Sequence, residues 1–482
     1  MITAIHYIAL LGTLLSASLL GPALFAYAQN EIDEAIKLSL YATLGGYFFY
    51  SLLMGVRGRR HDLNRVNTIC LVLISWTLFP VLLAIPLSDL FVISYGEAVF
   101  EAFSAFTTTG ADGIKNAASL PKSAIWLRYQ IQWLGGFATL VTFTLFLGSI
   151  RIGGLPYRFT GKTEKSIEGK ALTNRFLWLL GQFYLGFSLA AFTAFLICGI
   201  SPLQSILLTS SAVSTGGYIT NLESLGSSVM LVFSLFLFLG GTSVFWHRSL
   251  LSVDTKKLRS HRESYIILFI IALLTISFFY AVIKVSGNNS GFIAVASESI
   301  FNAVSVATTS GIESRPGIFA LLSPLLLLFI IFIGAGVYST GGGVKIFRLG
   351  AMLFHTSREL SNLVYPNGVN KSGAGGEKYT MFEMNTIWTM FCACVVVVGG
   401  GSIALSLSGL SFEASITAAI ATFSNAGPFY SPQWVAHGAQ GWPEYFEMNL
   451  NQKYILCLIM LFGRLEIIAI IAVINPFYWY QR

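Results

Sequence analysis

Long apolar runs, separated by short polar connections, follow one another along almost the whole chain. A helix needs about 20 residues to cross the roughly 30 Å hydrocarbon core of a bilayer. Ten runs reach this length, so the pattern predicts ten membrane-spanning helices. They cover residues 2–28, 36–56, 67–88, 124–150, 175–199, 226–246, 264–285, 319–350, 384–407 and 453–475.

Shorter semi-apolar segments lie between some of these runs and cannot span a bilayer. We expect each to be a half-helix that enters the membrane and turns back. They lie near residues 95–106, 201–212, 292–306 and 411–422.

Each predicted half-helix is followed by small or hydroxyl residues and then a glycine. The four segments are "TTTGAD" (107–112), "AVSTGGY" (212–218), "ATTSGIE" (307–313) and "FSNAGPF" (423–429). Their glycines recur about 95 to 115 residues apart. One such segment would mean only helix packing, but four in register indicate an internal repeat.

The repeat divides the chain into a leader and four units. The expected boundaries are 1–56 for a two-helix leader, then 57–150, 151–246, 247–350 and 351–482, with pore loops at 95–113, 201–219, 292–314 and 411–430. Each unit contains two full crossings, so the units are parallel and pack around an axis along the membrane normal. We therefore predict an all-α polytopic membrane protein in which four parallel helix–pore-loop–helix repeats have a pseudo-fourfold arrangement.

Irregular backbone at membrane depth needs protein or water around it to satisfy its polar groups. Four such loops around one axis would line a polar pathway, where carbonyl and hydroxyl oxygens can replace a cation's hydration shell. Glycine permits the positive φ angles that aim successive carbonyls inward. The predicted cation-binding residues are Thr108, Thr109, Gly110, Ser214, Thr215, Gly216, Thr309, Ser310, Gly311, Asn425, Ala426 and Gly427.

Acidic residues flank these loops. Asp112 and Glu313 follow predicted filter glycines and are candidates for the pore mouth. Four other acidic residues lie near the starts of the half-helices, where capping of the helix N-terminus is a better interpretation than attraction of cations to the mouth. They are Glu97, Glu101, Glu298 and Glu413.

The stretch "IGAGVYSTGGG" (333–343) interrupts the eighth apolar run with five glycines in eleven residues. It is either a kink packed against its neighbours or a loop that crosses and gates the permeation path. The hydroxyls of Tyr338, Ser339 and Thr340 favour the loop. The candidate gate residues are Gly334, Gly336, Ser339, Thr340, Gly341, Gly342, Gly343, Lys345 and Arg464.

Two basic residues belong to this candidate gate. An arginine at the depth of Arg464 costs at least about 2.5–3.5 kcal/mol. We interpret Arg464 as a fixed charge that faces the pore and acts with the loop as a cation barrier; the alternative is a pair with a buried carboxylate. Lys345 either orders the loop, faces a partner, or is a snorkelling surface lysine.

Composition and charge agree with a membrane protein. Only 11% of the residues are charged, against about 25% in soluble domains. The connections 57–66, 151–175, 247–262 and 345–378, with the C-terminus, hold 21 Lys and Arg residues, and the opposite side holds seven. The positive-inside rule makes the first side, and both termini, cytoplasmic. The net charge of +7 therefore reflects the excess of Lys and Arg in the cytoplasmic connections.

The N-terminus and the cysteines raise two smaller questions. Ala26 and Ala28 have signal-cleavage spacing, but no Lys or Arg precedes the run, so we expect a retained helix. All five cysteines lie in or beside apolar runs without zinc-like spacing, so we expect buried thiols and no disulfides.

Three motifs resemble the Trk/Ktr/HKT superfamily of potassium uptake proteins, and within it the TrkH family. They are "QIQWLGGFATLV" (130–141), "GAGVYSTGGGVKIFR" (334–348) and "GRLEI" (463–467), and the likeness covers nearly the whole chain. The resemblance implies a K⁺ pathway with one filter glycine per repeat, a gate at 334–343, and a homodimer with one pore per protomer. It also implies a separate cytosolic ring that binds nucleotide and regulates opening. Gly110, where Na⁺-tolerant members often carry serine, favours K⁺, while Asp112, Glu313 and Tyr338 depart from the family pattern.

We therefore expect a gated, channel-like K⁺ uptake protein of the plasma membrane, the inner membrane in bacteria. The alternatives are a symporter coupled to H⁺ or Na⁺ and a less selective monovalent cation transporter. The histidines lie at span ends or in loops, and acids are nearly missing from the spans, so an enzyme is not expected. We expect no bound cofactor, no metal other than K⁺, contact with membrane lipid, and no nucleic acid partner.

Overall fold

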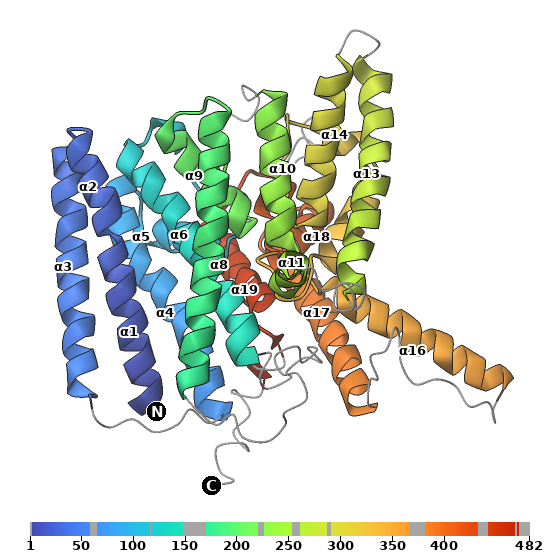
Figure 1. Ribbon diagram of the computed structural model, residues 1–482, viewed down its shortest axis with the longest axis horizontal. Helices are drawn as coiled ribbons and strands as arrows, with labels where there is room; N and C mark the ends of the chain where they lie inside the picture. Colours follow the sequence, from blue (N-terminus) through green and yellow to red (C-terminus); the bar gives the residue numbers. More distant parts are fainter. Residues whose placement is uncertain are drawn as a thin grey trace.

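A computed structural model describes residues 2–57, 65–115, 117–147, 170–219, 226–252, 261–286, 291–365, 381–431, 442–467 and 470–471. Within these ranges the regular structure is helical and contains no strand (Figure 1). The predicted all-α, polytopic fold is confirmed.

The leader consists of helices α1 (Ile2–Ser18), α2 (Leu20–Ala28) and α3 (Ile32–Gly55). α1 and α2 together make one apolar span, Thr3–Ala28. α3 packs back against α1, where a Cβ on Gly12 would lie 2.4 Å from the Phe49 ring, so glycine permits the close approach. These helices form one edge of the bundle (Figure 1).

Four groups of helices follow, each with a long helix, a short helix and further helices after a loop. The first has α4 (Arg65–Phe91), α5 (Tyr95–Phe106), η1 (Ala117–Ser119), α6 (Lys122–Val141) and the π-helix η2 (Thr142–Leu147). The second has α8 (Lys170–Ile197), α9 (Pro202–Ser214), α10 (Ser227–Gly241) and α11 (Val244–Leu251). The third has α13 (Arg262–Ser286), α14 (Phe292–Ala307), η6 (Phe319–Leu321), α15 (Pro324–Ile333) and α16 (Ile346–Val364). The fourth has α17 (Met381–Leu407), α18 (Phe412–Phe423), η7 (Gly427–Phe429) and α19 (Leu450–Arg464).

Several predicted spans are not continuous helices: 2–28 is divided into α1 and α2, and α19 ends at Arg464 within 453–475. The run 226–246 ends as α10 at Gly241 and turns by 107° into α11. In the run 319–350 the longest helix is the ten-residue α15, and α16, which begins at Ile346, leaves the bundle as a separate helix (Figure 1). Among the described helices, five are long and apolar enough to cross a membrane, or six if the bent pair counts as one span.

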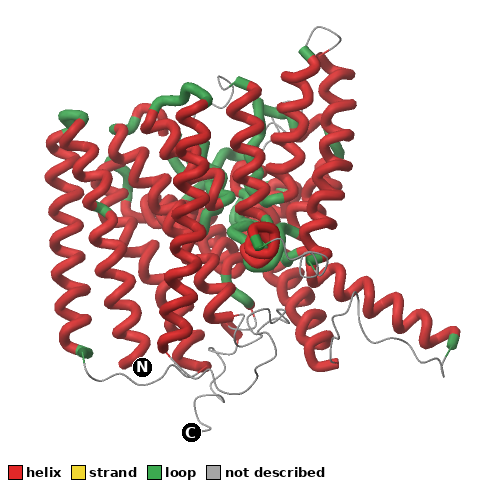
Figure 2. The backbone as a smooth tube through the Cα atoms, in the orientation of Figure 1, coloured by secondary structure: helices red, strands yellow, loops and turns green. Residues whose placement is uncertain are grey.

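The interior is unusual for a helical bundle because irregular segments gather at its centre, at mid-height (Figure 2). The short helices α5, α9, α14 and α18 end there, and their C-terminal halves are almost entirely buried. The outer surface is apolar instead, with Leu24, Ile276 and Val396 each 71% exposed. This inversion suits a lipid environment around a polar centre.

The prediction that all five cysteines are buried is wrong for Cys392, which is exposed on α17. Cys394 on the same helix is buried. Residues two apart on a helix point to different faces, so one thiol faces the bundle and the other faces outward.

Candidate functional site

The four loops that follow α5, α9, α14 and α18 share one backbone conformation. Each contains a residue other than glycine in the left-handed region, which such residues adopt rarely. These residues are Thr108, Thr215, Thr309 and Asn425, with φ angles of 55°, 50°, 60° and 52°. In each loop the next N–H donates to a carbonyl five residues earlier, with donors Thr109, Gly216, Ser310 and Ala426. The repeat seen in the sequence is therefore a repeat of backbone geometry.

This geometry changes the register in the second loop. Gly110, Gly311 and Gly427 stand two positions after the left-handed residue, and the glycine in that place of the second loop is Gly217, not Gly216. Ser214, one of the predicted binding residues, is the last residue of α9, and its hydroxyl donates to Ser210 O at 2.6 Å. The equivalent segment is thus 215–217.

The glycines are needed for two different reasons. Gly110 and Gly311 adopt φ angles of 70° and 71°, as the sequence led us to expect. Gly216 and Gly427 have no positive φ, so that expectation is wrong for them. Close approach explains Gly427 instead, because a Cβ there would lie 2.5 Å from the backbone atom Ala111 N, whereas a Cβ on Gly216 would meet the Gln132 amide and displace that side chain.

The loops meet in a closed ring. A Cβ on Gly110 in the first loop would lie 2.3 Å from Gly217 Cα in the second. The Ser310 hydroxyl of the third donates to Gly216 O at 2.9 Å.

The ring closes through the fourth loop. A Cβ on Gly311 would lie 3.0 Å from Ala426 O, and Gly427 N donates to Thr109 O of the first loop at 2.7 Å. Every successive pair of loops is therefore in contact. Two of the predicted filter carbonyls, Thr109 O and Gly216 O, therefore accept hydrogen bonds from neighbouring loops.

Hydroxyl groups hold further carbonyls at the ring. The Ser104 hydroxyl donates to Ala111 O at 2.8 Å, and the Ser305 hydroxyl makes the equivalent bond to Ile312 O at 2.7 Å. In the fourth loop, the Tyr445 hydroxyl donates to Gly427 O at 3.1 Å. The oxygen positions are therefore fixed by donors from outside the loops.

The glycine-rich segment 334–345 packs against the beginnings of these loops. Thr340 Oγ1 lies 3.1 Å from Thr215 Oγ1, and Gly342 N donates to Thr309 Oγ1 at 2.7 Å. A Cβ on Gly342 would lie 1.9 Å from Ser424 O. Residues 334–345 are all buried and lie outside regular helix, so this segment is a loop packed against the ring.

The same segment is anchored from its other side. Gly336 N and Thr340 N each donate, at 3.0 Å, to the last carbonyls of α10. Val337 N donates to Glu263 Oε1 at 2.6 Å, and the Ser339 hydroxyl donates to Gly336 O. Its backbone polar groups therefore have protein partners.

Arg464 joins the ring to the loop beneath it. Its Nε donates to Thr107 O at 2.5 Å, its Nη2 to Thr108 Oγ1, and its Nη1 to Thr340 O at 2.6 Å. Among the described residues its hydrogen-bond partners include no carboxylate. The nearby buried carboxylate, Glu466, pairs with Arg348 at 2.5 Å. These contacts favour the barrier interpretation of Arg464 over a structural ion pair.

Lys345 is 2% exposed, so the alternative of a snorkelling surface lysine is wrong. Its ammonium donates to Gly341 O and lies 5.2 Å from the centre of the Phe143 ring. Lys345 therefore orders the loop from within.

The two candidate mouth residues are both engaged by neighbours. Asp112, 51% exposed, accepts from Arg128 Nη2 at 2.9 Å. The Glu313 carboxylate accepts from Gly317 N and Phe319 N at 2.8 and 3.0 Å, and burial raises its pKa above the ordinary value. Glu313 is therefore a weaker attractor of cations than its sequence position implied.

The four acidic residues near the half-helix starts do not all have the same role. Glu97 completes a capping box with Ser94, and Glu413 lies in the first turn of α18, as capping predicts. Glu298 pairs with Arg315 at 2.8 Å. Glu101 is fully buried and pairs with Arg128, so the capping interpretation is wrong for it.

Sequence reasoning missed three buried polar features near the site. They are the Arg348–Glu466 pair, the cluster around Glu101 and Arg128, and the Gln132 amide behind Gly216. Both polar atoms of Gln132 lack a partner within the described residues. A charge or amide inside an apolar run is the signal that could have found them.

Comparison with known proteins gives consistent matches. The model of the family TrkH, described as cation transport protein, matches residues 60–476. The Trk system potassium uptake protein TrkH of Vibrio parahaemolyticus is 29% identical over 500 residues, with 98% of each chain covered. The protein of the same name from Escherichia coli K12 is 27% identical over 450 residues, covering 90% of this chain and 91% of that one. The crystal structure of the potassium transporter TrkH from V. parahaemolyticus matches with a TM-score of 0.85 at 26% identity and covers 99% of both chains.

Proposed function

Because this chain belongs to the TrkH family of cation transport proteins, we propose that it is the pore-forming subunit of a Trk-type potassium uptake system. The names of its relatives support K⁺ as the transported ion. The observation that carries the proposal is the closed ring of four loops, with the buried segment 334–345 packed against it. The position of this ring at the centre of a bundle with an apolar outer surface supports a pathway along its axis.

The proposed filter uses main-chain and hydroxyl oxygens to replace the water that a K⁺ ion loses. Its segments are 108–110, 215–217, 309–311 and 425–427. The Tyr445 hydroxyl, which holds Gly427 O, supports this role, as do the Ser104 and Ser305 hydroxyls, which hold the carbonyls directly after the first and third segments. Asp112 is the proposed attracting charge at the mouth.

The proposed gate is the segment 334–343 together with Lys345 and Arg464. In this conformation Thr340 and Gly342 touch the filter loops. Opening requires these contacts and those of Arg464 to break. The gate is thus a set of exchangeable hydrogen bonds at the inner end of the filter.

Ion uptake into proteoliposomes tests the function directly. We expect K⁺ and Rb⁺ uptake to follow an imposed membrane potential without a pH gradient, and Na⁺ uptake to be much slower. A requirement for a proton or sodium gradient would make the protein a symporter, and equal Na⁺ uptake would make it a less selective transporter. Empty liposomes give the background, and Gly399→Ala, in open space on α17, is the matched variant.

We further propose a multi-pass protein of the bacterial inner membrane with both termini in the cytoplasm, surrounded by lipid. It forms a homodimer and works with a cytosolic nucleotide-binding ring, and it binds no cofactor of its own besides the transported K⁺. Light scattering of the detergent-solubilised protein checks the dimer, and a monomer would contradict it. Copurification of a nucleotide-binding protein with the tagged chain from its native membrane checks the ring.

A further inference from the structure

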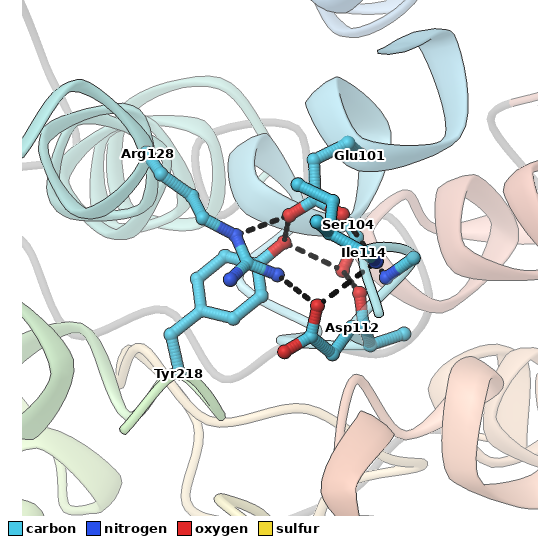
Figure 3. Close-up of polar contacts among 8 residues, drawn as sticks. Glu101, Ser104, Asp112, Ile114, Arg128 and Tyr218 are labelled. Carbon is cyan, nitrogen blue, oxygen red and sulfur yellow. Dashed lines mark hydrogen bonds and ion pairs between the residues drawn. The ribbon is translucent and has the colours of Figure 1, made fainter. Parts of the chain in front are cut away.

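A cluster of charged side chains lies behind the outer ends of the first and second filter loops (Figure 3). Arg128, on α6, is 4% exposed and bonds through Nε to Glu101 Oε1 and through Nη2 to Asp112 Oδ1 at 2.9 Å. Its guanidinium carbon also lies 3.7 Å from the centre of the Tyr218 ring. Two helices, α5 and α6, and both loops therefore converge on one buried cation.

Glu101 is the centre of this cluster. Its Oε1 accepts from the Tyr218 hydroxyl at 2.5 Å, and its Oε2 accepts from Gly113 N at 3.1 Å. The Tyr218 hydroxyl also lies 3.1 Å from Ser104 Oγ, which in turn holds Ala111 O. Gly113 ends the first loop, and Tyr218 directly follows Gly217 of the second. The carboxylate therefore ties the two loops together across their contact.

The other repeats lack this charged link. In the third, Asn302 occupies the place of Glu101, and its Oδ1 accepts from Ser314 N at 3.0 Å, just as Glu101 accepts from Gly113 N. The second and fourth repeats have Leu208 and Ala418 there. Ser314 in the third loop is thus held by the neutral amide of Asn302 together with the partly exposed Glu298, to which the Ser314 hydroxyl donates at 3.1 Å.

A buried ion pair costs several kcal/mol of desolvation per ion, so its presence where an amide would hold the loop calls for a further reason. Among the described residues, two contacts of Glu101 have no counterpart at Asn302. They are the pair with Arg128, which stacks on the Tyr218 ring, and the hydrogen bond from the Tyr218 hydroxyl, so both reach the second repeat. The charge therefore serves the spacing of two loops and not the fold of one.

Resting on the proposed function, we propose that Arg128, Glu101 and Tyr218 position the ion filter and thereby set its discrimination between K⁺ and Na⁺. Gly110 and Gly217 touch directly, so any relaxation of the link changes the spacing of the oxygens on both sides of this contact. A selective site needs its ligands held within about 0.5 Å by supporting side chains. These three are positioning residues and do not touch the ion.

Tyr218→Phe is the sharpest test. It keeps the ring beneath the Arg128 guanidinium and removes only the hydroxyl that reaches Glu101. We expect the K⁺ to Na⁺ uptake ratio, measured in the same proteoliposomes, to fall roughly two- to tenfold, the range that corresponds to one hydrogen bond. A ratio does not depend on how much protein is folded, so a purely structural effect would leave it unchanged.

Tyr41→Phe is the matched control. Tyr41, on α3 of the leader, is half-buried, and its hydroxyl also donates to a carboxylate, Asp89 Oδ2 at 3.1 Å, which lies outside the four filter loops. We expect a wild-type ratio for this variant. An unchanged ratio in Tyr218→Phe, or an equal fall in both variants, would overturn the inference.

A second variant keeps the test decisive if Tyr218→Phe does not fold. Arg128→Lys retains the buried positive charge but loses the planar fork that reaches both carboxylates. It should lower the ratio in the same way, and a wild-type ratio would overturn the inference. The wild-type protein separates the two proposals. If the wild type shows no preference for K⁺ over Na⁺, the proposed function fails. If the wild type and the variants are equally selective, only the positioning role is refuted.

Discussion

Four residues other than glycine hold the left-handed conformation at equivalent places, and three of them are threonines. This conformation costs an L-residue roughly 1–2 kcal/mol. Such strain persists only where the surroundings enforce it, and it is concentrated at functional sites. Its recurrence at Thr108, Thr215, Thr309 and Asn425 indicates that the direction of the following carbonyls matters more than local stability. The direction of the filter carbonyls therefore depends on the φ angle of one residue in each loop.

Gly110→Ser tests this at one residue. Serine would have to adopt a φ of 70°, and its Cβ would lie 2.3 Å from Gly217 Cα, so the first and second loops would have to separate. We expect a lower K⁺ to Na⁺ uptake ratio. Gly399→Ser, at a helical site with no atom within 4 Å of its Cβ position, is the control. Equal ratios in the two variants would contradict the filter assignment.

Arg464→Ala tests the barrier. Hydrogen bonds to a charged group contribute about 1.5–3 kcal/mol, so losing those to Thr107 and Thr340 should favour the open state roughly tenfold or more. The measurement is basal K⁺ uptake without any regulatory subunit. Arg315→Ala, with a side chain 44% exposed, is the control. Wild-type basal uptake in Arg464→Ala would remove Arg464 from the gate.

At the scale of elements, the most informative one is the interrupted helix α15–α16. Gly334 and Gly343 adopt φ angles of 80° and 79°, and Lys345 adopts 83°, so the chain leaves the helical path and returns to it at these positions. Between them the loop donates to α10, Glu263 and the Thr309 hydroxyl, and it accepts from the Thr215 hydroxyl. An irregular segment at this depth is stable because neighbouring elements satisfy its polar groups. Those same bonds can be exchanged when the gate opens.

Deleting Val337–Thr340 tests the element. The deletion removes the bond from Val337 to Glu263 and the contact of Thr340 with Thr215, so we expect K⁺ leak through an ungated path. Thr340→Val gives a milder version that keeps the side-chain shape, and Thr389→Val, whose exposed hydroxyl bonds within α17, is the control. Wild-type flux in both the deletion and Thr340→Val would show that the loop does not close the path.

At the scale of the whole molecule, contacts between distant segments hold the four repeats in one bundle. The Arg348–Glu466 pair joins the beginning of α16 to the chain that follows α19, and each side chain is 2% exposed. Removing one member of a buried pair leaves an uncompensated charge. The pair therefore couples the element that carries the gate loop to the one that carries Arg464.

Glu466→Gln is expected to destabilise the protein by about 3–5 kcal/mol, because it leaves Arg348 buried without its countercharge. The midpoint of thermal unfolding in detergent measures this effect. Glu359→Gln, at an acid that is 52% exposed, should leave the midpoint unchanged. A wild-type midpoint in Glu466→Gln would show that the pair contributes nothing to stability.

Local properties of the chain determined much of this picture. Apolar length predicted the helical fold, and glycines among hydroxyl residues located the four loops and the interrupted helix. The position of Arg464 within an apolar run identified it as a candidate gate residue. These features depend on neighbours in sequence, because helix length, helix breaking and the cost of a buried charge act over a few residues.

Only the tertiary structure decided the rest. It placed Gly217 in the ring, turned α10 into α11, buried Lys345, and paired Glu101 with Arg128 and Tyr218. Each of these depends on a partner far away in the chain, as Tyr218 is 117 residues from Glu101. A hydrophobic pattern carries no information on which distant groups meet, since those meetings follow from how the loops pack around their common axis.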